Sequence, residues 1–267
     1  MIHMISILMG VYNAEESLEQ CIDSVLNQSY ENFEFIICDD ASTDNSYELL
    51  KNIEKADSRI KLLKNTTNQG LASTLNYCLS HASGEYIARM DADDVNDLSR
   101  LEREMLFLEQ NPYYAFVGTQ CYKFDEQGVW GELVYPETPQ KKNLLWNTTY
   151  AHPTIIMKKD TLLAVGGYRV APETERCEDY DLWLRLLSKN FIGYNMPDYL
   201  YYYFEGRTSF SKFSYKYRVN EAKVRFQNFK NLGWLPEGIL FVIKPLIIGL
   251  IPRKIMMEIT LKRFKQK

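Results

Sequence analysis

The chain has 267 residues, 46% of them hydrophobic and 25% charged, a composition that is typical of globular proteins and excludes a largely disordered chain. Its five cysteines are scattered and form no CxxC pair, so neither a disulfide framework nor a zinc site is expected. The net charge of −4 is unevenly spread, because residues 206–267 hold 14 of the 31 Lys and Arg but only three acids. A basic tail on an acidic body indicates an anionic partner, such as membrane lipid or nucleic acid, or else a solvated helical face.

The first hundred residues alternate between predicted strands and predicted helices. Four short, mostly apolar runs predict strands: "ISILMGVY", "FEFIICD", "RIKLLKN" and "GEYIARM". Three segments between them carry apolar residues at helical spacing: "AEESLEQCIDSVLNQ", "STDNSYELLKNIEKA" and "GLASTLNYCLSHA". Ser42 or Asp44 signals the start of the second helix. This alternation predicts an α/β fold, with a mostly parallel sheet covered by helices on both faces.

Beyond Asn111 the alternation ends. An antiparallel pair of strands is predicted from "YAFVGTQCYKFDE" and "GVWGELVYP", joined at "EQG". A strand, a short helix and a Gly-Gly turn follow in "HPTIIMKKDTLLAVGGY". The next segments predict a helix, "ERCEDYDLWLRLLSKN", and then one or two strands, "FIGYNMPDYLYYYF". Residues 206–267 form a basic, partly amphipathic helical extension in this interpretation.

Polar side chains follow several of the predicted strands where they end, and ligands of parallel sheets bind beyond those carboxyl ends. Tyr12 follows the first strand and can stack on a base. Asp39 and Asp40 follow the second strand, where one carboxylate can accept a hydrogen bond from a base N–H. After the third strand, Asn68 and Gly70 permit a close approach of the backbone to a ligand.

Four aspartates crowd into "DADDVND", residues 91–97, directly behind the fourth predicted strand. Like charges at this spacing repel unless a cation lies among them. Asp91 and Asp93 have the outline of an Mg²⁺ or Mn²⁺ site, since both ions prefer hard oxygen ligands. An EF-hand fits poorly, because Asn96 stands where it needs glycine and a strand precedes the loop. A phosphatase with an aspartyl nucleophile matches "DADDV", but there the motif normally opens the domain.

A second acidic group opens the helix in "ERCEDYDLWLRL". Glu178 and Asp179 lie at its N-terminus, where the helix dipole stabilises negative charge. Two roles fit these carboxylates. They can simply cap the helix, or one of them, ionised and facing an acceptor hydroxyl, can act as a general base. His152, before Pro153, is most simply structural, but it can reach a metal or a phosphate.

Together these segments resemble the inverting family 2 glycosyltransferases of the Rossmann-like GT-A fold. The matching pieces arrive in the family's order and cover residues 4 to about 205: "MGVYN", "FEFIICDDASTDNS", "NQGLASTLNYCLSHASGEYIARMDADD", "HPTIIMKKDTLLAVGGY" and "EDYDLWLRL". One piece is unspecific, but five in order are highly specific. The resemblance implies a GT-A domain over residues 1–205, with a nucleotide-binding half (1–97) and an acceptor-binding half (98–205), followed by the extension 206–267.

The resemblance also implies how the donor is held. Tyr12 and Asp40, with Asp39 beside it, would hold the nucleotide base. Asp91 would face the ribose, and Asp93 would coordinate Mg²⁺ or Mn²⁺ on the donor diphosphate.

Catalysis would fall to a second set of residues. Asp179 would deprotonate the acceptor for in-line attack at the anomeric carbon. His152 and Arg207 would contact the metal or the phosphates, and Arg89 and Glu178 are further candidates for phosphate or acceptor contacts.

The family resemblance predicts a transferase that moves one sugar, or a few, from a nucleotide-diphospho-sugar to a saccharide or lipid-linked acceptor, as in bacterial surface-polysaccharide assembly. UDP is the favoured nucleotide on family grounds. Gly10 stands where the family usually has proline, and the QxxRW motif of processive synthases is absent from the sequence. A nucleotidyltransferase that makes such a sugar and a non-catalytic nucleotide-binding module are the rival hypotheses. A nucleotidyltransferase requires a Gly-rich loop with Arg and Lys after the first strand, and the segment "MGVYNAEES" contains neither Arg nor Lys.

The tail, "WLPEGILFVIKPLIIGLIPRKIMMEITLKRFKQK", has an apolar run too short to span a bilayer. Basic residues flank it, so an interfacial helix on an anionic membrane is the favoured interpretation, ahead of a hairpin against the body or against a second copy in a homodimer. The tail contains no recognisable nucleic-acid-binding module, so no nucleic-acid partner is expected. The first ten residues lack the features of a signal peptide. We therefore expect a cytoplasmic protein, peripheral on the inner face of a bacterial membrane.

Overall fold

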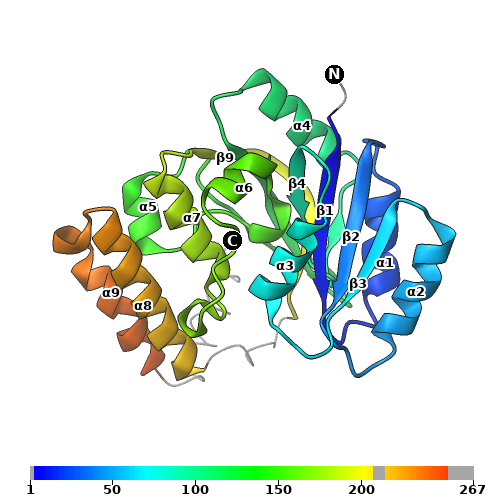
Figure 1. The fold of residues 1–267 in the computed structure, drawn as a ribbon. Helices are drawn as coiled ribbons and strands as arrows, with labels where there is room; N and C mark the ends of the chain where they lie inside the picture. Colours follow the sequence, from blue (N-terminus) through cyan, green and yellow to red (C-terminus); the bar gives the residue numbers. More distant parts are fainter. Residues whose placement is uncertain (1–2, 207–213, 252–267) are drawn as a thin grey trace.

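A computed structural model describes residues 3–206 and 214–251 of the chain (Figure 1). The described residues form one nine-stranded sheet in the order β3-β2-β1-β4-β8-β6-β9-β5, and β7 pairs with β6 beside this path. Helices flank the sheet, so the predicted α/β class is confirmed.

The N-terminal half is the parallel part of the sheet. β1 pairs in parallel with both β2 and β4, and β2 pairs in parallel with β3. All four predicted strands and the three helices between them are present. Their bounds are β1 Ile5–Val11, α1 Leu18–Leu26, β2 Phe33–Asp39, α2 Ser46–Ala56, β3 Ile60–Lys64, α3 Leu71–Ser80 and β4 Tyr86–Arg89.

Helix α2 begins at Ser46, later than either predicted start, because the polar residues before it bind another loop. Ser42 Oγ accepts a hydrogen bond from the Asn13 amide (3.0 Å), and Asp44 Oδ2 accepts one from the Glu15 amide (3.2 Å). These side chains therefore fasten the loop after β1 to the loop after β2, and Asp44 also contacts the start of the helix, because its Oδ1 atom accepts a hydrogen bond from the Ser46 amide (3.0 Å).

The C-terminal half adds the mixed part of the sheet. β6 and β7 form the predicted antiparallel hairpin, β8 runs antiparallel between β4 and β6, and β6 pairs in parallel with β9. Its elements are β5 Val95–Asn96, α4 Arg100–Gln110, β6 Phe116–Asp125, β7 Gly128–Leu133, α5 Lys141–Trp146, the 3₁₀ turn His152–Thr154, β8 Ile156–Lys158, α6 Lys159–Ala164, the 3₁₀ turn Pro172–Thr174, α7 Glu178–Ser188 and β9 Gly193–Phe204.

Helix α4 has no counterpart among the predicted elements, and its burial pattern gives the reason. Arg100 and Glu104 are both buried and form an ion pair at 3.0 Å. Two charged residues on the inner face interrupt the apolar stripe by which an amphipathic helix is recognised.

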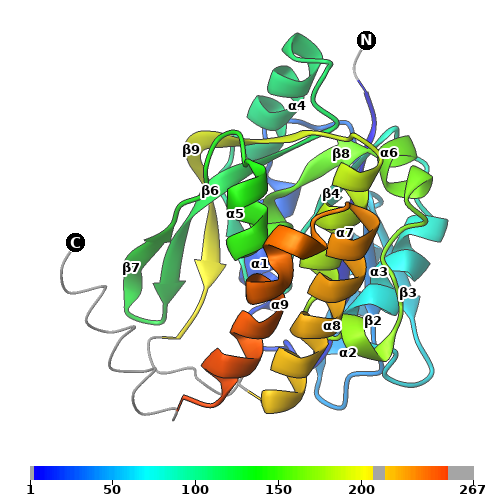
Figure 2. The ribbon, with the colours of Figure 1, turned by 90° about the vertical axis from the view of Figure 1, so that its left-hand side faces the viewer.

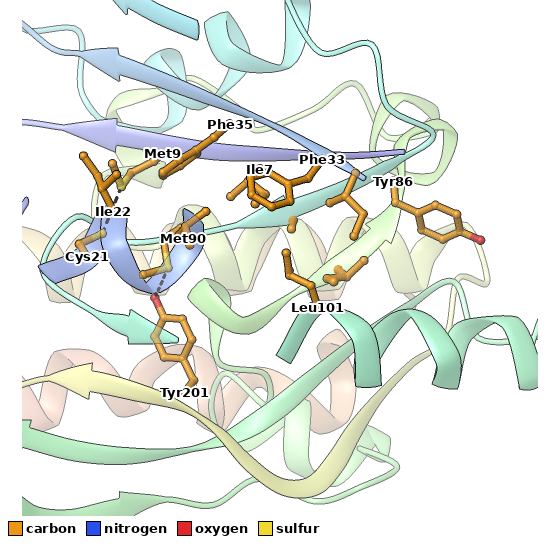
Figure 3. Close-up of a cluster of buried hydrophobic side chains, with 14 of the residues drawn as sticks. Ile7, Met9, Cys21, Ile22, Phe33, Phe35, Tyr86, Met90, Leu101 and Tyr201 are labelled. Atoms are coloured by element: carbon orange, nitrogen blue, oxygen red, sulfur yellow. Dashed lines mark hydrogen bonds between the residues drawn. The ribbon is translucent and has the colours of Figure 1, made fainter. Parts of the chain in front are cut away.

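A hydrophobic core lies on each face of the sheet. On one face, β1 contributes Ile7 and Met9, which lie with residues of α1 and α4 in the cluster that Figure 3 shows. On the other face, Leu8 of β1 packs among residues of α3 and α7. Burying one such aliphatic side chain contributes about 1.5–3 kcal/mol. The two cores hold the carboxyl ends of β1, β2 and β4 at one edge, which faces the bottom of Figure 1.

The extension begins with two helices, α8 (Tyr215–Asn231) and α9 (Leu235–Gly249), which lie side by side next to α5 and α7 (Figures 1 and 2). Asn228 of α8 donates to Asp181 of α7 (2.9 Å), and the buried Arg225 donates to the Leu145 carbonyl of α5 (2.6 Å). The predicted helical extension is thus confirmed over the described residues, and α8 is fastened to the body of the protein. Over those same residues, no helix combines the length and hydropathy that crossing a membrane requires.

Candidate active site

Three cavities open at the carboxyl edge of the sheet, among the described residues. Their volumes are about 620, 560 and 890 Å³. Glu178 lines the first and second, Asp91 lines the second and third, and Tyr12 lines the first and third. Because each cavity shares wall residues with the other two, they are parts of one site region.

The first cavity gathers Tyr12, Asp40, Asn68 and Gly70, four of the predicted nucleotide contacts. Tyr12 is 49% exposed and presents its ring to the opening. Asp40 is buried, and its carboxylate accepts hydrogen bonds from the amides of Gln69 (2.8 Å) and Gly70 (2.9 Å). Gly70 has φ +80, a conformation that glycine adopts without strain. Asp40 therefore holds the loop after β3 against the end of β2, and this loop forms one wall of the cavity.

Asp39 is in a different position from its neighbour. It is fully buried, and its carboxylate accepts a long hydrogen bond from the Ser42 amide (3.3 Å). It lines none of the three cavities described above. The predicted contact of Asp39 with a base thus has no support in the geometry, and Asp40 alone reaches the wall.

The loop after β4 brings three carboxylates together. One oxygen from each of Asp91, Asp93 and Asp94 lies within 4.8 Å of the others. Asp93 is exposed, whereas Asp94 is fully buried and accepts a hydrogen bond from the Phe204 amide through Oδ1 (2.7 Å). Its Oδ2 atom is buried without a hydrogen-bond partner, and burial with the nearby Asp91 and Asp93 raises the pKa of Asp94. An unsatisfied carboxylate oxygen beside two others fits a bound divalent cation.

Arg89 is the nearest positive charge to this group. It is buried at the end of β4 and forms an ion pair with Asp91. Burial opposes the guanidinium charge, but the Asp91 carboxylate outweighs it and raises the pKa of Arg89. Arg89 also lines the second cavity. The structure therefore places this predicted phosphate contact as the counter-ion of Asp91.

His152 lines the second cavity but stands outside the carboxylate group. Its Nε2 atom shares a hydrogen bond with the Tyr168 hydroxyl (3.0 Å). Burial, together with the Arg89 charge, lowers the pKa of His152, so the ring is neutral. Among the described residues, the group that can hold a metal consists of Asp91, Asp93 and Asp94 without this histidine. The geometry thus supports Asp94 as the third ligand in place of His152.

The acidic pair at the start of α7 lines the same second cavity as Asp91 and Asp93. Burial, with the neighbouring Asp179 charge, raises the pKa of Glu178 to about 7. Burial also raises the pKa of Asp179. Hydrogen bonds from the Tyr180 amide and from the Thr148 hydroxyl, which donates to Asp179 at 3.2 Å, partly offset this rise. A carboxylate with a raised pKa is a stronger base than an exposed one, which suits it to accept a proton from a hydroxyl.

Several lining residues were not anticipated from the sequence. Tyr217, Arg218 and Glu221 of α8 form one wall of the second cavity, although they come from the extension. Arg176 lines both the first and the second cavity. The position of Arg176, directly before Cys177 and the acidic pair, could have marked it as a site residue. Nothing in the local sequence marks the α8 residues in this way. Arg207, a predicted phosphate contact, lies outside the described residues.

Comparisons with known proteins identify the class. A family model described as "Glycosyl transferase family 2" matches residues 6–165. The putative glycosyltransferase EpsE of Bacillus subtilis (strain 168) is 40% identical over 260 residues, which cover 97% of this chain and 94% of that protein. The chain therefore belongs to glycosyl transferase family 2 and is a glycosyltransferase. This membership favours the predicted transferase over the rival nucleotidyltransferase.

A second relative and two solved structures are also similar. The UDP-Glc:α-D-GlcNAc-diphosphoundecaprenol β-1,3-glucosyltransferase WfgD of Escherichia coli is 32% identical over 230 residues, 86% of this chain and 83% of that protein. S. aureus TarS 1–349, solved with UDP-GlcNAc, has a TM-score of 0.70 at 15% identity, over 90% of this chain and 72% of that one. The mannosyltransferase PcManGT of Pyrobaculum calidifontis, solved with GDP-Man and Mn²⁺, has a TM-score of 0.63 at 19% identity, over 92% and 68%. These two likenesses confirm the predicted GT-A fold.

Proposed function

We propose that this protein transfers a single hexosyl group from a nucleotide-diphospho-sugar to a hydroxyl of a saccharide or lipid-linked acceptor, with inversion at the anomeric carbon. One observation carries the proposal: Asp179, Asp91 and Asp93 line one cavity of about 560 Å³. A candidate base and a candidate metal site thus face the same space. That is the arrangement that a metal-dependent displacement at a sugar carbon requires.

The nucleotide would occupy the first cavity, which opens between β1, the loop after β3 and the segment before α7. In this hypothesis Tyr12 stacks on the base, and the loop that Asp40 holds, with Asn68 and Gly70, approaches the nucleoside. UDP is the favoured nucleotide, because TarS has the same fold and was solved with UDP-GlcNAc, and because WfgD is named for UDP-Glc.

A divalent cation, Mn²⁺ or Mg²⁺, would be held by Asp91 and Asp93, with the buried oxygen of Asp94 behind them. When bound, such an ion neutralises charge on the diphosphate that leaves. The Mn²⁺ complex of PcManGT supports a metal of this type in a protein of this fold. Arg89 would keep Asp91 ionised, since the two side chains form an ion pair.

Asp179 would act as the general base. The acceptor hydroxyl gives its proton to the Asp179 carboxylate, and its oxygen forms a bond to the anomeric carbon. The bond from that carbon to the diphosphate breaks, and its electron pair leaves with the nucleoside diphosphate. Because attack occurs opposite the leaving group, one such step inverts the anomeric configuration. Removing the base from such a step costs roughly 10²- to 10⁴-fold in rate.

The test is hydrolysis of a panel of UDP-, GDP- and dTDP-sugars by the full chain, with Mn²⁺, Mg²⁺ or EDTA. The expected result is metal-dependent release of one nucleoside diphosphate, abolished by EDTA. Titration calorimetry of UDP and GDP with Mn²⁺ accompanies it, because many transferases turn over slowly without an acceptor. Folded protein that neither binds nor hydrolyses any donor would overturn the proposal.

The acceptor is proposed to be lipid-linked and met at an anionic membrane surface. WfgD, whose name gives a diphosphoundecaprenol acceptor, supports the first part. The second part rests on α9, whose outward side presents Ile239, Leu240, Ile243 and Ile247, which are 42, 74, 41 and 61% exposed. Their spacing at i, i+3/i+4 and i+7/i+8 makes one apolar stripe on the helix. The sequence that follows, residues 252–267, holds six Lys and Arg and one acid, which complements anionic lipid.

Vesicle sedimentation tests the membrane surface. The full chain is expected to pellet with vesicles that contain phosphatidylglycerol, less with phosphatidylcholine alone, and less again at high salt. Leu240→Ser and Ile247→Ser should weaken the binding, whereas Val129→Ser should not, because Val129 is similarly exposed (54%) but lies on β7. Equal binding by all four proteins would remove α9 as the docking surface, and no binding by any of them would leave the hairpin or homodimer alternatives.

A further inference from the structure

Arg176 occupies the junction of the two cavities that the proposed function assigns to nucleoside and reaction. It lines the first cavity with Asp40 and Gly70, and it lines the second with Asp91 and Asp179. In a nucleotide-sugar, the diphosphate connects the nucleoside to the sugar. If the nucleoside lies in the first cavity and the anomeric carbon lies in the second, the diphosphate crosses the boundary where Arg176 stands.

The other cations of these two cavities are already paired with carboxylates. Among the described residues, Lys and Arg side chains line them at four positions. Three of the four form ion pairs: Arg89 with Asp91, Lys123 with Glu205, and Arg218 with Glu221. No ion pair or side-chain hydrogen bond joins Arg176 to another described residue, and it is exposed. Its charge is therefore available to an anionic ligand.

A contact with α8 explains why Arg176 keeps its charge unpaired. The adjacent acid, Glu175, forms an ion pair with Lys216 of α8 at 2.6 Å. The Lys216 ammonium also lowers the pKa of Glu175. The extension thus binds the carboxylate that is nearest along the chain and leaves the guanidinium facing the cavities.

The backbone at Arg176 is in the left-handed region, with φ +65. For a residue with a side chain, this conformation is less favourable by roughly 1–2 kcal/mol, whereas glycine adopts it without this penalty. Strain of this kind is found where a side chain must be presented in one place, as at binding sites. At Arg176 this conformation belongs to a tight turn, in which the Cys177 amide donates to the Thr174 carbonyl (2.8 Å), and the turn carries the residue that lines both cavities.

From these observations we propose that Arg176 binds the diphosphate of the nucleotide-sugar donor and stabilises its negative charge as it leaves. The inference rests on the proposed function, and it adds a cationic residue of the protein to the positive charge that a metal ion would supply. Hydrogen bonds from a guanidinium to an anion contribute about 1.5–3 kcal/mol, so their loss weakens binding by roughly 10- to 100-fold.

The experiment measures binding of UDP and of uridine to the full chain by titration calorimetry with Mn²⁺ present. Arg176→Gly removes the charge and the strain together, and Arg176→Lys keeps the charge. Asn190→Gly is the matched control. Asn190 also has a positive φ (62), but it follows the C-terminal end of α7 and lines none of the three cavities. Thermal unfolding checks that each variant folds.

The expected result is that Arg176→Gly weakens UDP binding roughly 10- to 100-fold and leaves uridine binding within about twofold. Arg176→Lys should retain most of the UDP affinity, and Asn190→Gly all of it. Unchanged UDP binding in folded Arg176→Gly, or an equal loss for uridine, would overturn the assignment. Wild-type protein that binds none of the nucleoside diphosphates would instead overturn the proposed function, so the two failures are distinguishable.

Discussion

The two acidic groups of this site consist of the same residue types but differ in number and arrangement. The group after β4 clusters three carboxylates within 4.8 Å, and its central member, Asp93, is exposed. The pair at the start of α7, Glu178 and Asp179, is half-buried, and desolvation raises the pKa of both carboxyl groups. A cation would relieve the repulsion in the first group, whereas a proton would relieve the burial of charge in the second.

In the proposed mechanism, this difference separates two kinds of chemistry within a single cavity. A cluster of three mutually repelling carboxylates, one of them exposed, suits a metal ion, and a carboxylate with a raised pKa suits proton transfer. Helix α7 contributes as well, because its first amide groups donate to Asp179 and keep its pKa from rising further. The predictions below test whether the two groups can be disabled separately.

Replacing the proposed base should give the largest effect. Asp179→Asn keeps the shape and the Thr148 contact but cannot accept the proton, so transfer to the acceptor should fall by roughly 10³-fold. UDP binding with Mn²⁺ should be unchanged, because the metal group is intact. Steady-state transfer assays and calorimetry on the same protein measure the two quantities. Nearly full activity in this variant would remove Asp179 from its role.

Replacing a carboxylate of the proposed metal group should remove the response to Mn²⁺. Asp93→Asn should abolish the thermal stabilisation by Mn²⁺, which for wild type at 100 times the Kd is roughly 5–10 °C. In EDTA the same variant should melt slightly higher than wild type, because one of three repelling carboxylates is gone. Asp97→Asn is the control. Asp97 directly follows β5 and accepts hydrogen bonds from Ser99 outside the cluster. An equal loss of the Mn²⁺ response in both variants would contradict the assignment.

The raised pKa of Glu178 predicts a stability effect that depends on pH. The pKa is about 7 in the folded protein, against an ordinary value of 4.5. Between these values the unfolded chain ionises first, so this group's contribution to stability is present below pH 4.5 and is lost as pH rises through 7. Glu178→Gln never ionises, so it should match wild type near pH 4 and exceed it by up to about 3 kcal/mol near pH 8. Denaturant unfolding across pH measures this, and parallel curves for the two proteins would contradict it.

The smallest expected effect comes from the hydrogen bond that supports the base. Thr148→Val removes the hydroxyl that donates to Asp179 at 3.2 Å, so the pKa of Asp179 should rise further. The acid limb of the pH–rate profile should move to higher pH by roughly half to one unit, with little change at high pH. Thr149→Val is the neighbouring control, because the Thr149 side chain does not line the second cavity. A uniform drop at all pH values would indicate a structural effect instead.

Some features of the site were predictable from the sequence because they are local. Asp91 and Asp93 are two positions apart at the end of a strand, and a parallel sheet brings such ends to one edge. Glu178 and Asp179 precede an apolar helical run, which marks a helix N-terminus. The first four strands were recognisable for the same reason, since each is a continuous apolar run bounded by polar residues.

Other features depend on partners that are distant in the chain. Asp94 differs from Asp93 because its carboxylate meets the Phe204 amide, 110 positions later. His152 is turned toward Tyr168 rather than toward the carboxylate group. Asp39 and Asp40 are adjacent, yet of the two only Asp40 lines one of the three described cavities, where it binds the loop after β3.

The sequence by itself determined the α/β class, the family and the two acidic groups, because hydrophobic periodicity and short motifs are written in neighbouring residues. Only the tertiary structure decided which carboxylates are buried, which arginines are paired, and that α8 forms a wall of the site. Burial and pairing depend on segments that the fold brings together, and the pKa of an acid depends on both. Arg176 is the clearest case: its sequence position is unremarkable, and its unpaired charge follows from the contact between Glu175 and Lys216 of α8.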